Sequence, residues 1–146
     1  MYKSHILFMV VLLFFVIHAQ AQPVVYPDFT VDSTSITFSE SEPLEGEEVT
    51  IRVRVKNIGM VAPTLNEDLV VLLYEGNPKI NPLQILCRDV ILDLTPGQTD
   101  DIEAQWRPPA GATEVYVVVN PPGKKYIQES NSANNVTHKS ITALHR

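Results

Sequence analysis

The sequence predicts an all-β protein that folds as an antiparallel β-sandwich. Apolar runs of strand length recur between turn-forming residues at short intervals, and no segment keeps a helical period. The chain has eleven prolines, all between Pro23 and Pro122, and none interrupts an apolar run. Several runs alternate apolar and polar side chains, as expected for strands with one face in a core and the other in solvent.

Residues 1–21 have the three parts of a secretory signal peptide. Lys3 provides the positive charge, residues 6–17 are an unbroken apolar run, and Ala19-Gln20-Ala21 fits the small-x-small cleavage rule. The run is too short to span a bilayer comfortably. We expect cleavage after residue 21 and export to the periplasm, the cell surface or the medium, with no membrane span afterwards. Retention of the segment as a membrane anchor is the alternative.

The rest of the chain, residues 22–146, has the length of a single domain. The formal net charge of −6 argues against nucleic acid or an anionic membrane as the partner. A single cysteine, Cys87, excludes a disulfide scaffold. Because it follows Ile85 and Leu86, we expect a buried hydrophobic residue in a strand of a monomer. An intermolecular bridge and a reactive thiol are the alternatives.

The first strand is expected to be interrupted. Phe29, Val31, Ile36 and Phe38 are its apolar positions, and the polar residues 32–35 break it, either as a bulge or as a switch between sheets. Five glutamates then fall within the segment from residue 39 to residue 48. They could form a cation site, but carboxylates this close together repel one another, so a solvated loop is expected.

Residues 49–57 are the clearest strand, because apolar and polar side chains alternate along it with period two. Arg52 and Arg54 on its polar side are expected to pair with Asp101 and Glu103 of a neighbouring strand, although a basic row could also bind an acidic glycan. The apolar set is assigned to the core and consists of Val49, Ile51, Val53 and Val55.

Two turns are predicted from residues that tolerate positive φ. Asn57 and Gly59 end the strand of residues 49–57. Pro96 and Gly97 are the two central residues of a Thr-Pro-Gly-Gln sequence, the pattern of a type II turn.

Four more strands complete the sandwich. Residues 69–74 are nearly all apolar, as in a central strand covered on both faces. Residues 84–94 are predicted to be a strand pair or one bent strand, with its irregularity at Arg88-Asp89. Residues 101–107 alternate and place Trp106 in the core, with stacking on a sugar ring as the alternative. The strand of residues 114–120 directs Val115, Val117 and Val119 inward.

A tight corner is expected just before the last apolar run, residues 136–144. Its structural residues are Glu129, Asn131, Asn134 and Asn135. Asparagine tolerates left-handed backbone, and its amide can bond neighbouring backbone groups, so we expect both features here. No metal site is predicted, because calcium requires several carboxylates and the corner itself contains one.

The order of these features resembles the CARDB family, the cell-adhesion-related domain found in bacteria. Pro27-Asp28 opens the first strand, and the Leu-Thr-Pro-Gly-Gln sequence of residues 94–98 precedes the tryptophan strand. The Glu-x-Asn-x-x-Asn-Asn corner of residues 129–135 closes the set. The resemblance covers about residues 27–144. It implies a seven-stranded sandwich similar to immunoglobulin and fibronectin type III domains, which is extracytoplasmic and has no enzymatic activity. Asn120 and Ser132 stand where the family often carries acids.

No catalytic, cofactor or metal site is predicted. After cleavage only His138 and His145 remain beside Cys87, and they have no metal-ligand spacing. Nucleophile-elbow and phosphate-loop motifs are absent from the sequence.

The expected partner is therefore a protein or a glycan at the cell envelope. A secreted or cell-surface module for protein interaction or adhesion is the favoured function. A structural accessory domain of the periplasm is one alternative. The other is a carbohydrate-binding module, for which the candidate aromatic residues are Tyr74, Tyr116 and Tyr126.

Overall fold

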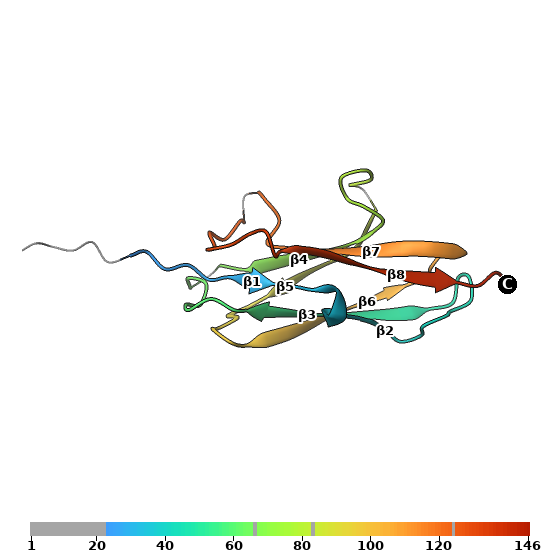
Figure 1. Ribbon diagram of the computed structural model, residues 1–146, viewed down its shortest axis with the longest axis horizontal. Helices are drawn as coiled ribbons and strands as arrows, with labels where there is room; N and C mark the ends of the chain where they lie inside the picture. The colour runs from blue at the N-terminus through green and yellow to red at the C-terminus, as the bar shows by residue number, and fades with distance from the viewer. Residues whose placement is uncertain (1–22, 66, 83, 124) are drawn as a thin grey trace, which may run out of the picture.

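The computed structural model describes residues 23–146, except residues 66, 83 and 124, so the predicted signal peptide lies outside the described residues. The described part forms two antiparallel sheets that stack face to face (Figure 1). Within it, no helix has the length and hydropathy needed to cross a bilayer. The predicted β-sandwich is confirmed. Its elements are β1 Phe29–Thr30, the 3-10 helix η1 Ser33–Ser35, β2 Ile36–Phe38, β3 Val49–Asn57, β4 Leu69–Glu75, β5 Ile85–Ile91, β6 Thr99–Trp106, β7 Gly111–Val119 and β8 Val136–Ala143.

The first sheet is built around β3, with β6 on one side and both β1 and β2 on the other. The break between β1 and β2 is η1, capped by Asp32, whose carboxylate accepts hydrogen bonds from the backbone of Thr34 (2.8 Å) and Ser35 (3.0 Å). A switch between sheets, one of the two predicted explanations, is therefore wrong. Because β1 and β2 are halves of one edge strand, the eight described strands correspond to the seven expected.

The second sheet has the strand order β5-β4-β7-β8. Residues 84–94 contain the single strand β5, and its irregularity lies at Leu86 instead of Arg88-Asp89, because Leu73 pairs with Cys87 but Tyr74 with Ile85. The extra residue lets Leu86 and Cys87 both pack against the core, which strict alternation would forbid. Cys87 is half-buried, less than predicted, and burial raises the pKa of its thiol.

The inner faces of the two sheets form the core. All seven valine and isoleucine residues assigned to it from β3 and β7 are fully buried. Trp106 of β6 is buried as well, and its indole Nε1 donates a 2.8 Å hydrogen bond across the sandwich to Glu75 Oε2 at the end of β4. Lys139 of β8 also links the two sheets, since its Nζ donates to the carbonyl of Ile36 at 2.7 Å.

The two predicted turns differ in their backbone. In the second, Gly97 has φ 78° and the amide of Gln98 donates to the carbonyl of Thr95 at 3.0 Å, as a type II turn requires. In the first, neither Asn57 nor Gly59 has positive φ, so that part of the prediction is wrong. Gly59 is constrained by space instead, since a Cβ there would lie 2.5 Å from the backbone nitrogen of Asp28.

Candidate functional site

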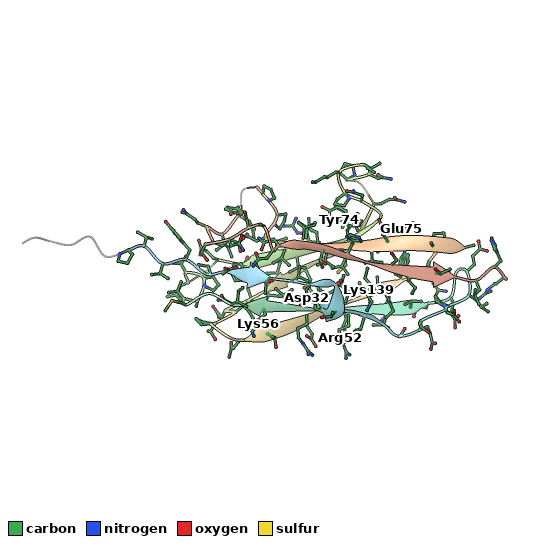
Figure 2. All side chains as sticks on the ribbon, viewed as in Figure 1. Asp32, Arg52, Lys56, Tyr74, Glu75 and Lys139 are labelled. Atoms are coloured by element: carbon green, nitrogen blue, oxygen red, sulfur yellow. The ribbon has the colours of Figure 1, made fainter. Side chains whose placement is uncertain are left out.

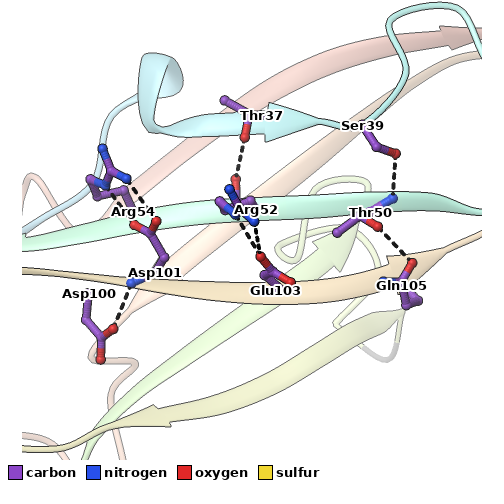
Figure 3. Close-up of polar contacts among 9 residues, drawn as sticks. All are labelled: Thr37, Ser39, Thr50, Arg52, Arg54, Asp100, Asp101, Glu103 and Gln105. Carbon is purple, nitrogen blue, oxygen red and sulfur yellow. Dashed lines mark hydrogen bonds and ion pairs between the residues drawn. The ribbon is translucent and has the colours of Figure 1, made fainter.

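The two outer faces of the sandwich differ in chemistry. The outer face of the first sheet is a polar ladder between β3 and β6 (Figure 3). Arg52 Nε donates to Glu103 Oε1 at 2.7 Å, and Arg54 donates to both oxygens of Asp101 at 2.7 and 2.9 Å. The predicted pairing is confirmed. Because these acids already accept from the arginines, the basic row offers little to an acidic glycan.

The outer face of the second sheet is apolar at its centre, over β4 and β7. Side chains alternate along β4, so Val71 and Leu73 enter the core while Val70, Leu72 and Tyr74 point outward. The outward three are nevertheless buried, packed with Tyr116 and Val118 of β7. The prediction of a strand buried on both faces is confirmed. No helix or further sheet of the described residues covers this side (Figure 1).

Strand register arranges these outward side chains in two rows across the sheet. One row runs from Arg88 on β5 through Leu72 and Val118 to Val136 on β8. The members of the other are Ile85, Tyr74, Tyr116 and His138. In the second row the Tyr116 ring stacks on the imidazole of His138, with centroids 4.7 Å apart and planes 16° apart. We call the two rows together the apolar face.

Two loops turn the apolar face into a hollow of about 810 Å³. The β4–β5 loop and the β7–β8 loop both rise from the outer side of the second sheet (Figure 1). Asn77, Pro78 and Lys79 line one side of the hollow, and Pro121 and Pro122 line the other. Tyr74 lies on this outer side, close to the β4–β5 loop (Figure 2). The two loops are the walls of this hollow, and the outward side chains of the sheet are its floor, so the open channel between the loops runs perpendicular to the strands. We call this shape the saddle.

The three candidate tyrosines do not form one exposed aromatic platform. Tyr74 is 9% exposed, and one face of the Tyr116 ring is stacked on His138. Tyr126 is 42% exposed, but it lines a separate hollow of about 530 Å³ beside Asn135. Sugar binding by all three together is therefore not supported by their placement.

The asparagine corner joins the two ends of the domain. Glu129 accepts hydrogen bonds from the backbone nitrogen of Phe29 (3.1 Å) and the amide of Asn120 (2.7 Å), and also from the amide of Asn135. The amide of Asn134 donates to Asp28 Oδ1 at 2.9 Å. These bonds connect the segment before β8 to the beginning of β1, about 100 residues earlier in the chain.

The prediction for the asparagines themselves needs correction. None of Asn131, Asn134 and Asn135 has positive φ, and only Asn131 caps a backbone group, accepting from the amide of Ala133 at 3.0 Å. The asparagine with left-handed backbone is Asn120 instead, with φ 50°. Its side chain is buried and exchanges two hydrogen bonds with the backbone of Ile127, at 2.7 and 2.9 Å. The tolerance of asparagine for left-handed backbone was the sequence signal for this role.

Glu129 is the half-buried carboxylate of the corner. Burial raises its pKa above the usual range, and the hydrogen bonds from Asn120, Asn135 and Phe29 partly oppose that effect. The side-chain Oδ1 atoms of Asn134 and Asn135 are buried without a hydrogen-bond partner among the described residues. Among the described residues, no group of three or more His, Cys, Asp and Glu side chains is arranged to hold a metal ion. The hydrogen bonds of the corner hold the segment before β8 against the start of β1.

Comparison with known proteins identifies the domain. The CARDB family model matches residues 26–139. No curated protein sequence matches the chain. Among solved structures, the CARDB domain of a Pyrococcus furiosus protein, in complex with di-metal ions, is 19% identical, with a TM-score of 0.66 over 83% of this chain and 96% of that one.

Two further structures are similar. A domain of a proposed cell surface protein from Methanosarcina acetivorans is 16% identical, with a TM-score of 0.59 over 82% of this chain and 93% of that one. A protein from Geobacter metallireducens is 34% identical, with a TM-score of 0.56 over 77% of this chain and 93% of that one. With the family model matched across most of its length, the chain belongs to the CARDB family, a non-catalytic type of immunoglobulin-like β-sandwich domain.

Proposed function

We propose that this chain is a non-enzymatic interaction module of the cell surface or the secreted fraction, which binds a partner protein through its apolar face. The observation that carries the proposal is the contrast between the two outer faces. One is a ladder of paired charges, whereas the other is a hollow floored by buried and half-buried apolar side chains, with Val136 exposed at its β8 end. Apolar patches of this kind on a soluble domain commonly mark interaction sites.

Three other observations support this proposal. Val136, at the β8 end of the hollow, is 51% exposed. Burial of this apolar side chain against a partner would be favourable. The described residues that line the hollow include no carboxylate, thiol, serine or threonine. The signal-like residues 1–21, together with the cell-surface name of the Methanosarcina relative, favour export.

The proposal is tested by capture from the native cell envelope followed by crosslinking. Wild-type protein is expected to capture a defined partner, and Val136→Asp is expected to lose it, because a buried carboxylate in an apolar interface is costly. Met60→Asp is the matched control, since Met60 is also an exposed apolar residue but lies in the β3–β4 loop. Absence of any partner, or equal capture by both variants, would contradict the proposal.

A carbohydrate-binding module is the second candidate, and the exposed ring of Tyr126 favours it. A glycan array separates the two functions. Binding of a glycan that Tyr126→Ala abolishes and Val136→Asp leaves intact would replace the proposal above. No binding to either protein or glycan would leave the structural accessory role.

A further inference from the structure

We infer that the hollow on the apolar face accepts an extended, acidic and aliphatic peptide segment of the partner, lying across the strands between the two loops. This inference rests on the proposed function and specifies the chemistry of its partner. It follows from the dimensions of the saddle, the position of its charges and the shape of its floor.

The dimensions fit a short stretch of extended chain. Four strands about 4.8 Å apart span about 15 Å, which is the length of about four or five extended residues. The walls are the Asn77–Lys79 and Pro121–Pro122 segments, so the open direction runs from β5 to β8. A chain in that direction would pass over Leu72 and Val118 and reach Val136.

The charges at the β5 end favour a carboxylate. Arg88 and Lys79 both line the hollow, and neither makes an ion pair or a hydrogen bond through its charged group with another described residue. Arg52, Arg54, Arg107 and Lys125, by contrast, each pair with an acid. In a chain of net charge −6, two unpaired cations beside one apolar hollow are complementary to an acidic ligand.

The floor favours aliphatic side chains over a sugar ring. Stacking on a sugar requires an accessible aromatic face, but Tyr74 is buried and Tyr116 is stacked on His138. Half-buried Val118 and exposed Val136 instead form an aliphatic row that the nearly buried Leu72 continues beneath the hollow. A peptide with isoleucine, valine or proline side chains fills such a row, and a sugar would leave its hydroxyl groups without partners there.

The experiment is selection of a random nine-residue peptide library displayed on phage against the full chain. The enriched peptides are expected to combine aliphatic residues with Asp or Glu. The affinity of the best synthetic peptide is then measured by calorimetry. Arg88→Glu and Val136→Asp are each expected to weaken this affinity by about tenfold or more. Replacement of the peptide's acidic residues by lysine is expected to have the same effect.

Lys56→Glu is the matched control for Arg88→Glu, because Lys56 is an exposed cation of the first sheet, on the opposite side of the molecule from Tyr74 (Figure 2). It is expected to leave peptide affinity unchanged. Backbone amide shifts of Leu72, Val118 and Val136 are expected to move on peptide addition, as seen by NMR, while those of Arg52 and Arg54 stay in place.

Each contrary outcome has a distinct meaning. Enrichment of basic peptides, no enrichment at all, or equal weakening by Lys56→Glu overturns the inference. If the envelope partner is captured by wild type and equally by Arg88→Glu, the interaction function stands and the acidic-segment inference fails. Self-association that Val136→Asp abolishes would assign the face to a second copy of this chain and also overturns it.

Discussion

Single buried amides hold together segments that are distant in the sequence. Asn57 is fully buried and makes four hydrogen bonds through its side chain. Its amide nitrogen donates to the carbonyls of Val61 (2.9 Å) and Leu94 (2.8 Å). Its oxygen accepts from the backbone of Gly59 (2.9 Å) and Asp28 (3.3 Å). One side chain thus satisfies four backbone groups from three segments, and none of the four has a strand partner for that bond.

Asn57→Ala is therefore expected to lower the free energy of unfolding by about 3 kcal/mol, since each buried backbone group without a partner costs about 1–3 kcal/mol. Urea unfolding measures the change. Asn131→Ala is the control, because Asn131 is exposed and its side chain caps one amide, so a loss below about 1 kcal/mol is expected. Equal losses in the two variants would contradict the role assigned to Asn57.

Glu129 is expected to stabilise the folded protein more at acidic pH than at neutral pH. Burial raises its folded-state pKa above the ordinary value of 4.5, so the folded protein binds this proton more tightly than the unfolded chain. The contribution is complete below about pH 4.5 and is lost as the pH rises through the folded pKa. The free energy of unfolding of wild type relative to Glu129→Gln should thus increase between pH 7 and pH 4.5.

Asp101 is the control for this measurement, because its pKa is shifted in the opposite direction. The hydrogen bond from Arg54 lowers its pKa below the ordinary value of 3.8, so its contribution is present above that pH and is lost as the pH falls through the lowered value. Relative to Asp101→Asn, wild type should lose stability only under strong acid. A difference between wild type and Glu129→Gln that did not vary with pH would contradict the raised pKa.

At the scale of elements, close backbone contact joins the start of β1 to the end of β3. Gly59 allows this contact, because a Cβ would lie 2.5 Å from Asp28 N and 2.9 Å from Pro27 C, and backbone atoms cannot move aside cheaply. Gly59→Ala is expected to destabilise the fold by about 1–3 kcal/mol through overpacking. Thermal unfolding measures it. Ile58→Ala is the neighbouring control, since Ile58 is 50% exposed and little change is expected.

Trp106 connects β6 to β4 across the sandwich. Trp106→Ala is expected to cost about 3–5 kcal/mol, because it removes a large buried ring. Trp106→Phe should cost less, keeping most of the packing but leaving Glu75 without its indole donor. Native fluorescence is expected to be blue-shifted and protected from iodide. A red emission maximum with free quenching would show an exposed ring and contradict the core assignment.

For the whole molecule, the corner is expected to close the domain without calcium. Glu129 of the corner and Asp28, which the fold brings beside it, already accept hydrogen bonds from asparagine amides, and calcium requires six to eight oxygen ligands. Thermal unfolding in millimolar calcium and in chelator should give the same midpoint. A midpoint that rises strongly with calcium would make the corner a cation site, with the unpartnered oxygens of Asn134 and Asn135 as its additional ligands.

Features of the structure that depend on neighbouring residues could be predicted from the sequence, and features that depend on pairing between distant segments could not. The alternation of residues 49–57 placed Val49 and Val55 in the core, because period two is a property of the strand itself. The same rule could not locate the bulge at Leu86, which arises from pairing with β4. The candidate tyrosines were found in the sequence, but the partnership of Tyr116 with His138 was not, since it depends on the register of β7 and β8.

The sequence by itself determined the sandwich, its strands, its inner faces and its family, because alternation, proline placement and turn residues act over a few neighbouring positions. Only the tertiary structure decided which outer face is apolar and open, and which amides hold distant segments together. Both depend on segments that meet across the fold, as Phe29 and Glu129 do from 100 residues apart. The physical reason is that register and long-range hydrogen bonds are set when the strands pair, so no local pattern encodes them.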